Sequence, residues 1–237
     1  EIGGISKMFS SRLSVVNYYH QQNLSGSLSH NPVNSIVEDE YQTLWVGTVE
    51  GGLNCCLKGS DSFLHYTTET PASLAHNTVS VLMLGDEDRL YVGTWGGGLG
   101  WINRKPSASK RYMPVPLNDP FVSSLAFDPV SHLLWIGTMN NVYVYNPADG
   151  SISEPFLNES KEIINQNALG MCITRERELW ISSPFGLLRV NLSAYEKGQL
   201  KYKKYVYQLD SPDSGHRERI TSIFQAKDGT IWLGSNG

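Results

Sequence analysis

One five-residue pattern occurs five times along this chain, and its spacing limits the possible folds more than any other feature. The first copy is Leu44-Trp45-Val46-Gly47-Thr48. The aromatic residues of the five copies are Trp45, Tyr91, Trp135, Trp180 and Trp232, which are 46, 44, 45 and 52 residues apart. A fixed period of this length is typical of supersecondary units that stack on their neighbours. We therefore expect residues 1–237 to form a single repeat region rather than unrelated domains.

Each period has the pattern of a four-stranded antiparallel meander. In the unit that begins at Val33, short β-rich runs at 33–39, 44–48, 53–57 and 63–67 are separated by polar turns. A glycine pair, Gly51-Gly52, marks the hairpin between the second and third runs, because glycine adopts the positive φ that tight hairpins need. The run 79–84 is apolar on both faces, which indicates a sheet covered on both sides. Stacked four-stranded sheets with this period predict an all-β fold, a β-propeller.

The same frame divides the chain into blades. The expected parts are a half blade at 1–30, blades at about 31–76, 77–119, 120–166 and 167–216, and a half blade at 217–237. Gly3-Gly4 in the first half matches the start of a third strand, and the last half stops just after a second strand. The parts add up to five blade-equivalents. Two arrangements remain open, a closed five-blade ring or an excerpt of a larger ring such as a seven-bladed propeller.

Composition excludes several classes of function. Against 23 Asp and Glu the chain has 19 Lys and Arg, a net charge of −4, which argues against a nucleic-acid-binding surface. No apolar run approaches the length of a membrane span. Cys55, Cys56 and Cys172 have no metal-ligand spacing and are expected to be small strand residues, so we expect no metal and no cofactor. Because the chain begins inside a repeat, we expect any targeting signal or membrane anchor to lie outside it.

The repeat resembles a known family. The lead-in at 27–31, the stretch 34–39 with Leu44–Thr48 and 51–54, and the closing stretch 221–234 are similar to the two-component regulator propeller repeat. That family forms the periplasmic sensor region of hybrid two-component histidine kinases, mostly in gut Bacteroidetes. The resemblance implies a sensor for oligosaccharides released from glycans, which signals as a homodimer through a membrane helix and kinase domains outside this segment.

The repeated aromatic residues are expected to be structural. They lie in the middle of a strand, once in each blade, so Trp45, Tyr91, Trp135, Trp180 and Trp232 are predicted to fill the core between blades. The glycines two residues later, Gly47, Gly93 and Gly137, belong to the same anchor pattern. The fourth copy departs from it, with Ser182-Ser183 in place of Gly-Thr.

One further tryptophan is the strongest candidate for ligand contact. Trp95 lies in the turn between second and third strands, where the sibling repeats have Val49, Met139 and Pro184. In a propeller this turn shares a face with the connection that leads into the next blade. An exposed indole at this place could stack on the apolar face of a pyranose ring, or it could instead cover a neighbouring turn or meet a partner subunit.

Polar residues on the same predicted face could add hydrogen bonds or ion pairs to a sugar. His30-Asn31 and His76-Asn77 also lie there, but they occupy equivalent positions before first strands, so a structural role is expected. The other ligand-binding candidates are Glu50, Asn140, Asn141, Phe185, Arg217 and Arg219.

No catalytic residues are predicted. The chain has no nucleophile elbow, no phosphate-binding glycine loop before a helix and no metal-ligand spacing. Propeller active sites assemble from separate blades, so two alternatives to the sensor remain: a polysaccharide lyase or hydrolase, and a protein-interaction scaffold.

Overall fold

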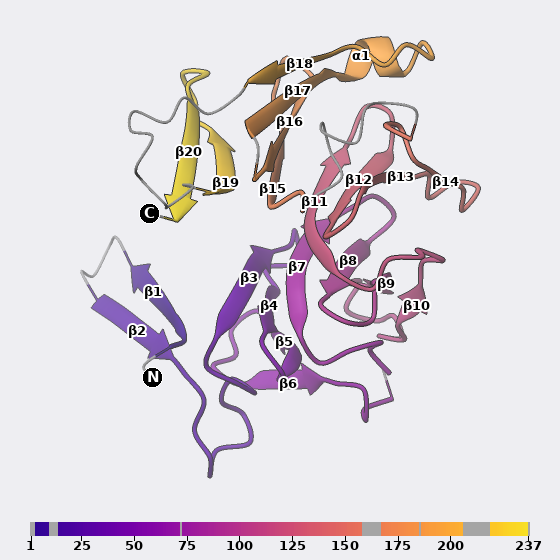
Figure 1. The fold of residues 1–237 in the computed structure, drawn as a ribbon. Helices are drawn as coiled ribbons and strands as arrows, with labels where there is room; N and C mark the ends of the chain where they lie inside the picture. The colour runs from indigo at the N-terminus through magenta and orange to yellow at the C-terminus, as the bar shows by residue number, and fades with distance from the viewer. Residues whose placement is uncertain are drawn as a thin grey trace. The chain divides into compact units, whose positions relative to one another are not determined.

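The computed structural model describes residues 3–9, 14–71, 73–157, 167–184, 186–205 and 219–236. These residues form antiparallel sheets, so the all-β prediction is confirmed (Figure 1). The chain divides into two compact units, Glu1–Phe121 and Val122–Gly237. The border falls between two sheets, close to the expected blade boundary at 119/120.

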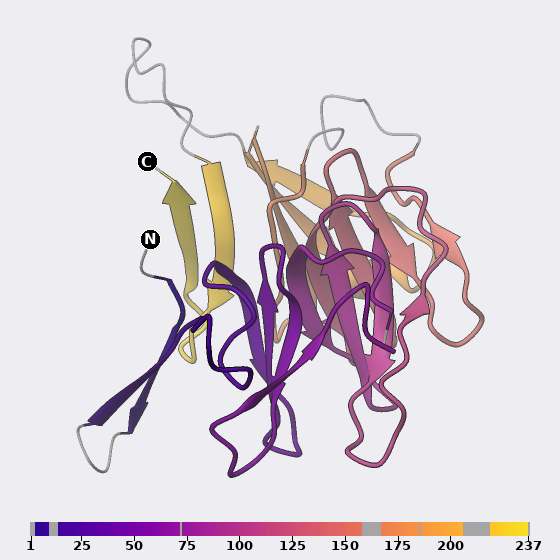
Figure 2. The same ribbon diagram turned by 90° about the horizontal axis from the view of Figure 1, so that it is seen from below.

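The described residues of the first unit form two four-stranded sheets and one two-stranded sheet. β3 and β7, the first strands of the two larger sheets, pack against each other (Figures 1 and 2). The strands are β1 (Ile5–Phe9) and β2 (Ser14–Tyr18); β3 (Val33–Glu38), β4 (Leu44–Thr48), β5 (Gly52–Cys56) and β6 (Phe63–Tyr66); and β7 (Val79–Leu84), β8 (Arg89–Thr94), β9 (Leu99–Asn103) and β10 (Met113–Pro114).

The second unit repeats the plan. Among its described residues, two sheets have four strands in sequential order and a third has two. A short helix, α1 (Leu192–Tyr195), follows the third strand of the second sheet. The strands are β11 (Val122–Asp128), β12 (Leu133–Thr138), β13 (Val142–Tyr145) and β14 (Ile152–Ser153); β15 (Gly170–Ile173), β16 (Glu178–Ser183), β17 (Gly186–Asn191) and β18 (Tyr202–Tyr205); and β19 (Arg219–Gln225) and β20 (Ile231–Asn236).

The strands occupy the expected positions. β4 begins and ends as expected, and β5 begins at Gly52, one residue before the expected start. Each four-stranded sheet falls inside one expected blade range, and the two-stranded sheets fall inside the two half blades. Whether all of these blades form a single propeller region, and whether its ring closes at five blades or is larger, stays a prediction.

The aromatic anchors are buried in the first three repeats. Trp45, Tyr91 and Trp135 are each 0% exposed. Trp45 packs with residues of the next blade such as Leu82 and Leu90, and its indole Nε1 donates to Asp39 Oδ2 at 2.8 Å. The apolar area removed from water at this seam is the main force that holds neighbouring blades together.

The last two anchors differ from the expectation. Trp180 is only half-buried and stacks on Tyr205, with ring centroids 5.5 Å apart. Trp232 is 64% exposed, beside its cross-strand partner Phe224 at 65%. Its sheet has two strands, and within the described residues no further strand pairs with β20. The burial predicted for Trp232 is therefore wrong for this part of the chain, because a neighbouring blade has to supply the cover.

The glycine of the repeat permits close approach between blades. A Cβ on Gly47 would lie 2.5 Å from Val79 Cγ1, and one on Gly137 would lie 2.8 Å from Ala168 Cβ. In the fourth repeat the glycine lies on the partner strand instead. Ser182 occupies the position of the repeat glycine and pairs with Gly170, and a Cβ added to Gly170 would lie 2.9 Å from Thr221 O. This exchange explains how the fourth copy tolerates serine.

Bulges at the start of the first strands were not predicted. The register of β3 shifts between Val33 and Ser35, and β7, β11 and β19 shift at the equivalent place. The extra residue turns toward the next blade: Asn34 Nδ2 donates to Val79 O at 2.9 Å, and Ser123 Oγ donates to Ala168 O at 2.8 Å. The bulges of β3 and β11 therefore each add a polar tie to the neighbouring blade.

The hairpin glycines give a first test of the local geometry. Gly52 has φ +78°, and a Cβ on it would lie 2.2 Å from Tyr66 O. Gly59 has a similar φ of +75°, but no described atom lies within 4 Å of its Cβ position. We expect Gly59→Ala to cost about 1 kcal/mol of unfolding free energy, the backbone strain alone. Gly52→Ala should cost about 1–3 kcal/mol more because of the clash, as measured by urea denaturation. If the two variants lose the same unfolding free energy, the predicted clash at Gly52 is contradicted.

Candidate ligand-binding face

Antiparallel order places alternate turns at opposite ends of a blade. The β4–β5 and β8–β9 turns therefore share an end with the connections that lead into β7 and β11. Backbone hydrogen bonds join them: Gly52 N donates to Asn77 O at 2.7 Å, and Gly98 N donates to Pro120 O at 2.9 Å. We call residues 49–51, 76–78, 95–98 and 119–121 the turn face of the first unit. The predicted juxtaposition of turns and connections is present.

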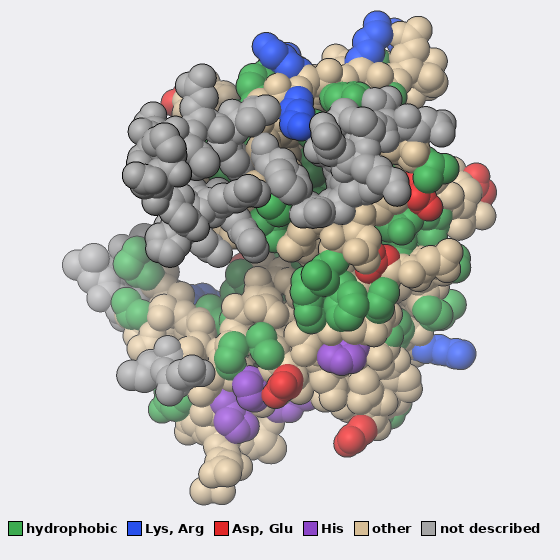
Figure 3. Space-filling view, in the orientation of Figure 1, with side chains coloured by type: hydrophobic (Ala, Val, Ile, Leu, Met, Phe, Trp, Pro, Cys, Tyr) green, Lys and Arg blue, Asp and Glu red, His purple; other side chains and the backbone are tan. Residues whose placement is uncertain are grey.

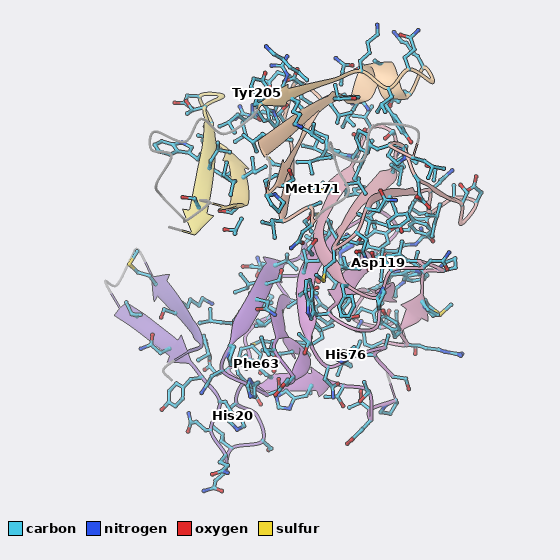
Figure 4. The ribbon with its side chains drawn as sticks, viewed as in Figure 1. His20, Phe63, His76, Asp119, Met171 and Tyr205 are labelled. Atoms are coloured by element: carbon cyan, nitrogen blue, oxygen red, sulfur yellow. The ribbon has the colours of Figure 1, made fainter. Side chains whose placement is uncertain are left out.

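Trp95 lies on the turn face with part of its side chain exposed. Its backbone N donates to Thr78 O at 2.9 Å, and the residue forms an isolated β-bridge with Phe121. The Trp95 and Phe121 rings pack at 5.3 Å between centroids with an interplanar angle of 58°, and Trp95 remains 37% exposed. The pair forms an apolar platform, and Figure 3 shows apolar side chains gathered beside a histidine where Figure 4 labels His76.

A hydrogen-bond donor and an acceptor accompany the platform. Thr78 N donates to His76 Nδ1 at 3.0 Å, so the neutral imidazole carries its hydrogen on Nε2. His76 lies against the Trp95 turn, because a Cβ on Gly96 would lie 2.8 Å from His76 Cδ2. Glu50 is exposed, and its backbone N donates to Thr78 Oγ1 at 3.3 Å. Thr78 thus ties the Glu50 turn to the Trp95 turn.

The asparagines of the two His-Asn pairs make structural contacts, as was expected. Asn77 Oδ1 accepts a hydrogen bond from Thr68 N at 2.9 Å, and Asn31 Oδ1 accepts one from His20 N at 2.6 Å. Both asparagines therefore fasten the end of a fourth strand to the connection that follows it.

The structure describes only some of the ligand-binding candidates of the second unit. Asn140 is exposed, and Asn141 is committed to its turn, since its Nδ2 donates to Glu154 Oε2 at 2.6 Å and its Oδ1 accepts from Val142 N at 2.8 Å. Phe185 and Arg217 lie outside the described residues, and for Arg219 only the backbone, in β19, is described.

Sequence reasoning missed Phe121 as the partner of Trp95. A signal was available, because Phe121 directly precedes the first-strand residue Val122, in the connection expected to meet the turn. Thr78 links the two turns through its backbone carbonyl and its hydroxyl, and no residue pattern in the sequence predicts either contact.

The chemistry of the cysteines matches a structural role. Cys55 and Cys56 are buried in two different cores, on opposite faces of β5. Burial raises the pKa of Cys55 to about 12, so this thiol stays protonated at neutral pH. Across the part of the chain that the structure describes, no three His, Cys, Asp or Glu side chains are grouped to hold a metal ion. No helix there is long and apolar enough to span a membrane.

Antiparallel four-stranded sheets with this order and spacing define blades of a β-propeller. Two segments of the chain, 27–50 and 215–237, match the family model described as two component regulator propeller. The resemblance is thereby confirmed over those segments. No curated protein matches the chain in sequence.

Solved structures share the fold. The extracellular domain of a proposed hybrid two-component system, BT3049 from B. thetaiotaomicron, superposes with a TM-score of 0.77 at 19% identity, over 99% of this chain and 30% of that one. The BT4673 extracellular domain from the same organism gives 0.72 at 22% identity, over 93% and 28%. PorZ, a surface component of the type-IX secretion system of Porphyromonas gingivalis, gives 0.63 at 15%, over 94% and 34%. The chain thus spans about a third or less of each.

Proposed function

We propose that this chain is part of the extracytoplasmic ligand-sensing propeller of a hybrid two-component sensor, and that its ligand is a glycan-derived oligosaccharide. The family match supports the regulator assignment, and the fold shared with extracellular domains of two-component systems is compatible with it. The parent protein would be a periplasm-facing homodimeric receptor with its kinase domains on the other side of the membrane. The segment itself would bind without catalysing a reaction.

The observation that carries the ligand proposal is the partly exposed Trp95–Phe121 platform on the turn face. A pyranose presents an apolar C–H face that suits an aromatic ring, while its hydroxyls need donors and acceptors beside that ring. His76 Nε2–H and the Glu50 carboxylate supply one of each near the same turn. The carboxylate would repel acidic sugars, so a neutral or amino sugar suits this site better than a uronic acid.

At the opposite end of these blades, an ion pair and a hydrogen bond join the two sheets. Arg104 forms an ion pair with Glu40 at 2.9 Å, and Tyr41 OH donates to Asp88 Oδ1 at 2.6 Å. These contacts join the β3–β6 sheet to the β7–β10 sheet. A ligand on the turn face would therefore meet two blades that move as one body, and occupancy would be transmitted by rigid-body displacement rather than by chemistry.

Titration with a panel of neutral, amino and acidic oligosaccharides tests this function. For a ligand that binds, we expect Trp95→Ala to weaken affinity at least about tenfold in calorimetry, which corresponds to about 1.4 kcal/mol. The control is Trp232→Ala, which removes another exposed indole from a strand rather than from the turn face. Equal losses in both variants, or no loss in Trp95→Ala, would place the ligand elsewhere. Cleavage of a panel member would favour the propeller enzyme instead.

A further inference from the structure

One end of the first unit carries acidic side chains but no Lys or Arg. Antiparallel order brings five segments to this end, and they include the turn face: 19–32, 49–51, 67–78, 95–98 and 115–121. In the sequence these segments contain three acidic residues, which are Glu50, Glu69 and Asp119. A cationic group that approaches this end therefore meets attraction, with no lysine or arginine of the same segments to oppose it.

Basic residues of the first unit gather at the opposite end. The connection between β9 and β10 holds four of them. At that end Arg104 pairs with Glu40 at 2.9 Å, and Arg89 pairs with Glu87 at 2.6 Å. Glu50 on the turn face, by contrast, forms no ion pair with any residue that the structure describes. Its carboxylate is therefore available to a ligand, whereas those of Glu40 and Glu87 already have partners.

The backbone fixes Glu50 close to the Trp95 turn. Glu50 N donates to Thr78 Oγ1 at 3.3 Å, and Thr78 O accepts from Trp95 N at 2.9 Å. Glu50 has φ +59°, where the next repeat has Gly96 with φ +138°. A residue with a Cβ is strained in this conformation, and strained positions of this kind cluster at ligand-binding sites. The turn thus presents a carboxylate where glycine would connect the strands with less strain.

The aromatic platform also favours a cation. An ammonium group is attracted to the face of an indole, and Trp95 is 37% exposed beside Phe121. Asp119 is only 3% exposed, and its Oδ1 accepts a hydrogen bond from Phe121 N at 3.0 Å. An acidic side chain therefore positions the second ring of the platform. The rings and the nearby carboxyl groups favour the same kind of ligand, one with an apolar face and a positive charge.

We propose that the turn face recognises a protonated amino sugar, with its ring on the Trp95–Phe121 platform and its ammonium beside the Glu50 carboxylate. This inference rests on the proposed function, which leaves neutral and amino sugars open, and it decides between them. A free amine is preferred over an N-acetylated one, because acetylation removes the charge that Glu50 and the indole attract. A linear polyamine carries the same ammonium but has no ring to stack on Trp95.

Three oligosaccharides that differ only at C2 test the charge preference. Glucosamine, N-acetylglucosamine and glucose oligomers of one length and β-1,4 linkage are titrated into the whole chain by calorimetry at mildly acidic pH. We expect the glucosamine oligomer to bind at least about fivefold more tightly than either of the others. Most of this difference should disappear at about 1 M salt, where the Debye length is about 3 Å.

Glu50→Gln tests the residue, because the amide keeps the shape of the side chain and removes its charge. The affinity ratio between the glucosamine and glucose oligomers should fall below about twofold in this variant. The matched control is Glu87→Gln, which removes another exposed carboxylate at the opposite end and should leave the ratio as it is in the parent chain. A linear diamine, titrated in parallel, should bind more weakly than the glucosamine oligomer.

The inference is overturned if the three oligomers bind equally well, if both glutamine variants lower the affinity ratio to the same extent, or if the diamine binds as tightly as the glucosamine oligomer. Equal binding of the oligomers that is weakened by Trp95→Ala would leave sugar sensing at the platform intact and remove only the charge preference. Binding of none of the three also overturns the inference, and the wider oligosaccharide panel then decides the proposed function separately.

Discussion

Trp45→Ala is expected to destabilise the protein by about 3–5 kcal/mol, the usual cost of deleting a fully buried tryptophan side chain. Trp45 is 0% exposed at the seam between two blades, and its indole also satisfies the buried carboxylate of Asp39. The substitution leaves a cavity and removes the hydrogen bond that Trp45 Nε1 donates to Asp39 Oδ2, while Tyr41 N and Thr43 N still donate to Oδ1. Urea denaturation followed by far-ultraviolet circular dichroism measures the loss.

Trp232→Ala is the matched comparison, because it changes the same repeat position where the indole is 64% exposed. We expect a loss of less than about 1 kcal/mol, as is usual for exposed positions. If the two variants lose the same stability, the assignment of Trp45 as a seam residue and of Trp232 as an uncovered one is contradicted.

The second large effect concerns a buried ion pair in the second unit. Asp128 is 1% exposed and accepts a hydrogen bond from Arg177 at 2.6 Å, while Arg177 also pairs with Glu196 at 2.7 Å. Arg177→Met should cost about 3 kcal/mol, since it leaves a buried carboxylate without its cationic partner. Glu87→Gln removes the exposed partner of the Arg89–Glu87 pair and should cost less than about 1 kcal/mol.

The same site predicts a pH dependence. Burial by itself would raise the pKa of Asp128, but hydrogen bonds from Ser131 and Arg177 outweigh it, and the pKa lies below its ordinary value. The stabilisation is therefore fully present above the pKa of an aspartate in the unfolded chain, about 3.9, and is lost as pH falls through the lower folded value. In Asp128→Asn this part of the acid destabilisation should disappear. An unchanged stability curve between pH 5 and pH 2 would contradict the assignment.

The repeat period of the sequence predicts those structural features that depend on the local residue pattern. Strand positions such as Leu44–Thr48, the hairpin at Gly52 and the burial of Trp45 and Trp135 follow from repeated residue types. The exposure of Trp232 does not follow, because burial depends on which blade stands beside a strand, and every copy of the motif looks alike. The bulge at Asn34 could not be predicted either, since it arises from contact with Val79 on the next blade.

The candidate site likewise combines one residue that the sequence predicts with contacts that it does not predict. Trp95 is visible in the sequence because an indole interrupts a turn where sibling repeats have smaller side chains. Its neighbours are set by packing: Phe121 reaches it from the next connection, and Thr78 joins it to the Glu50 turn through backbone and hydroxyl bonds. Such groups become neighbours only when blades stack, so spacing along the chain says little about them.

Deuterium exchange of the whole chain, recorded with and without each oligosaccharide of the panel, tests the account most directly. We predict that a bound ligand slows exchange at the 95–98 turn and at Phe121, and leaves the ion-paired end around Glu40 and Asp88 unchanged. Slowing at that ion-paired end, with no change at Trp95, would contradict the proposed ligand face.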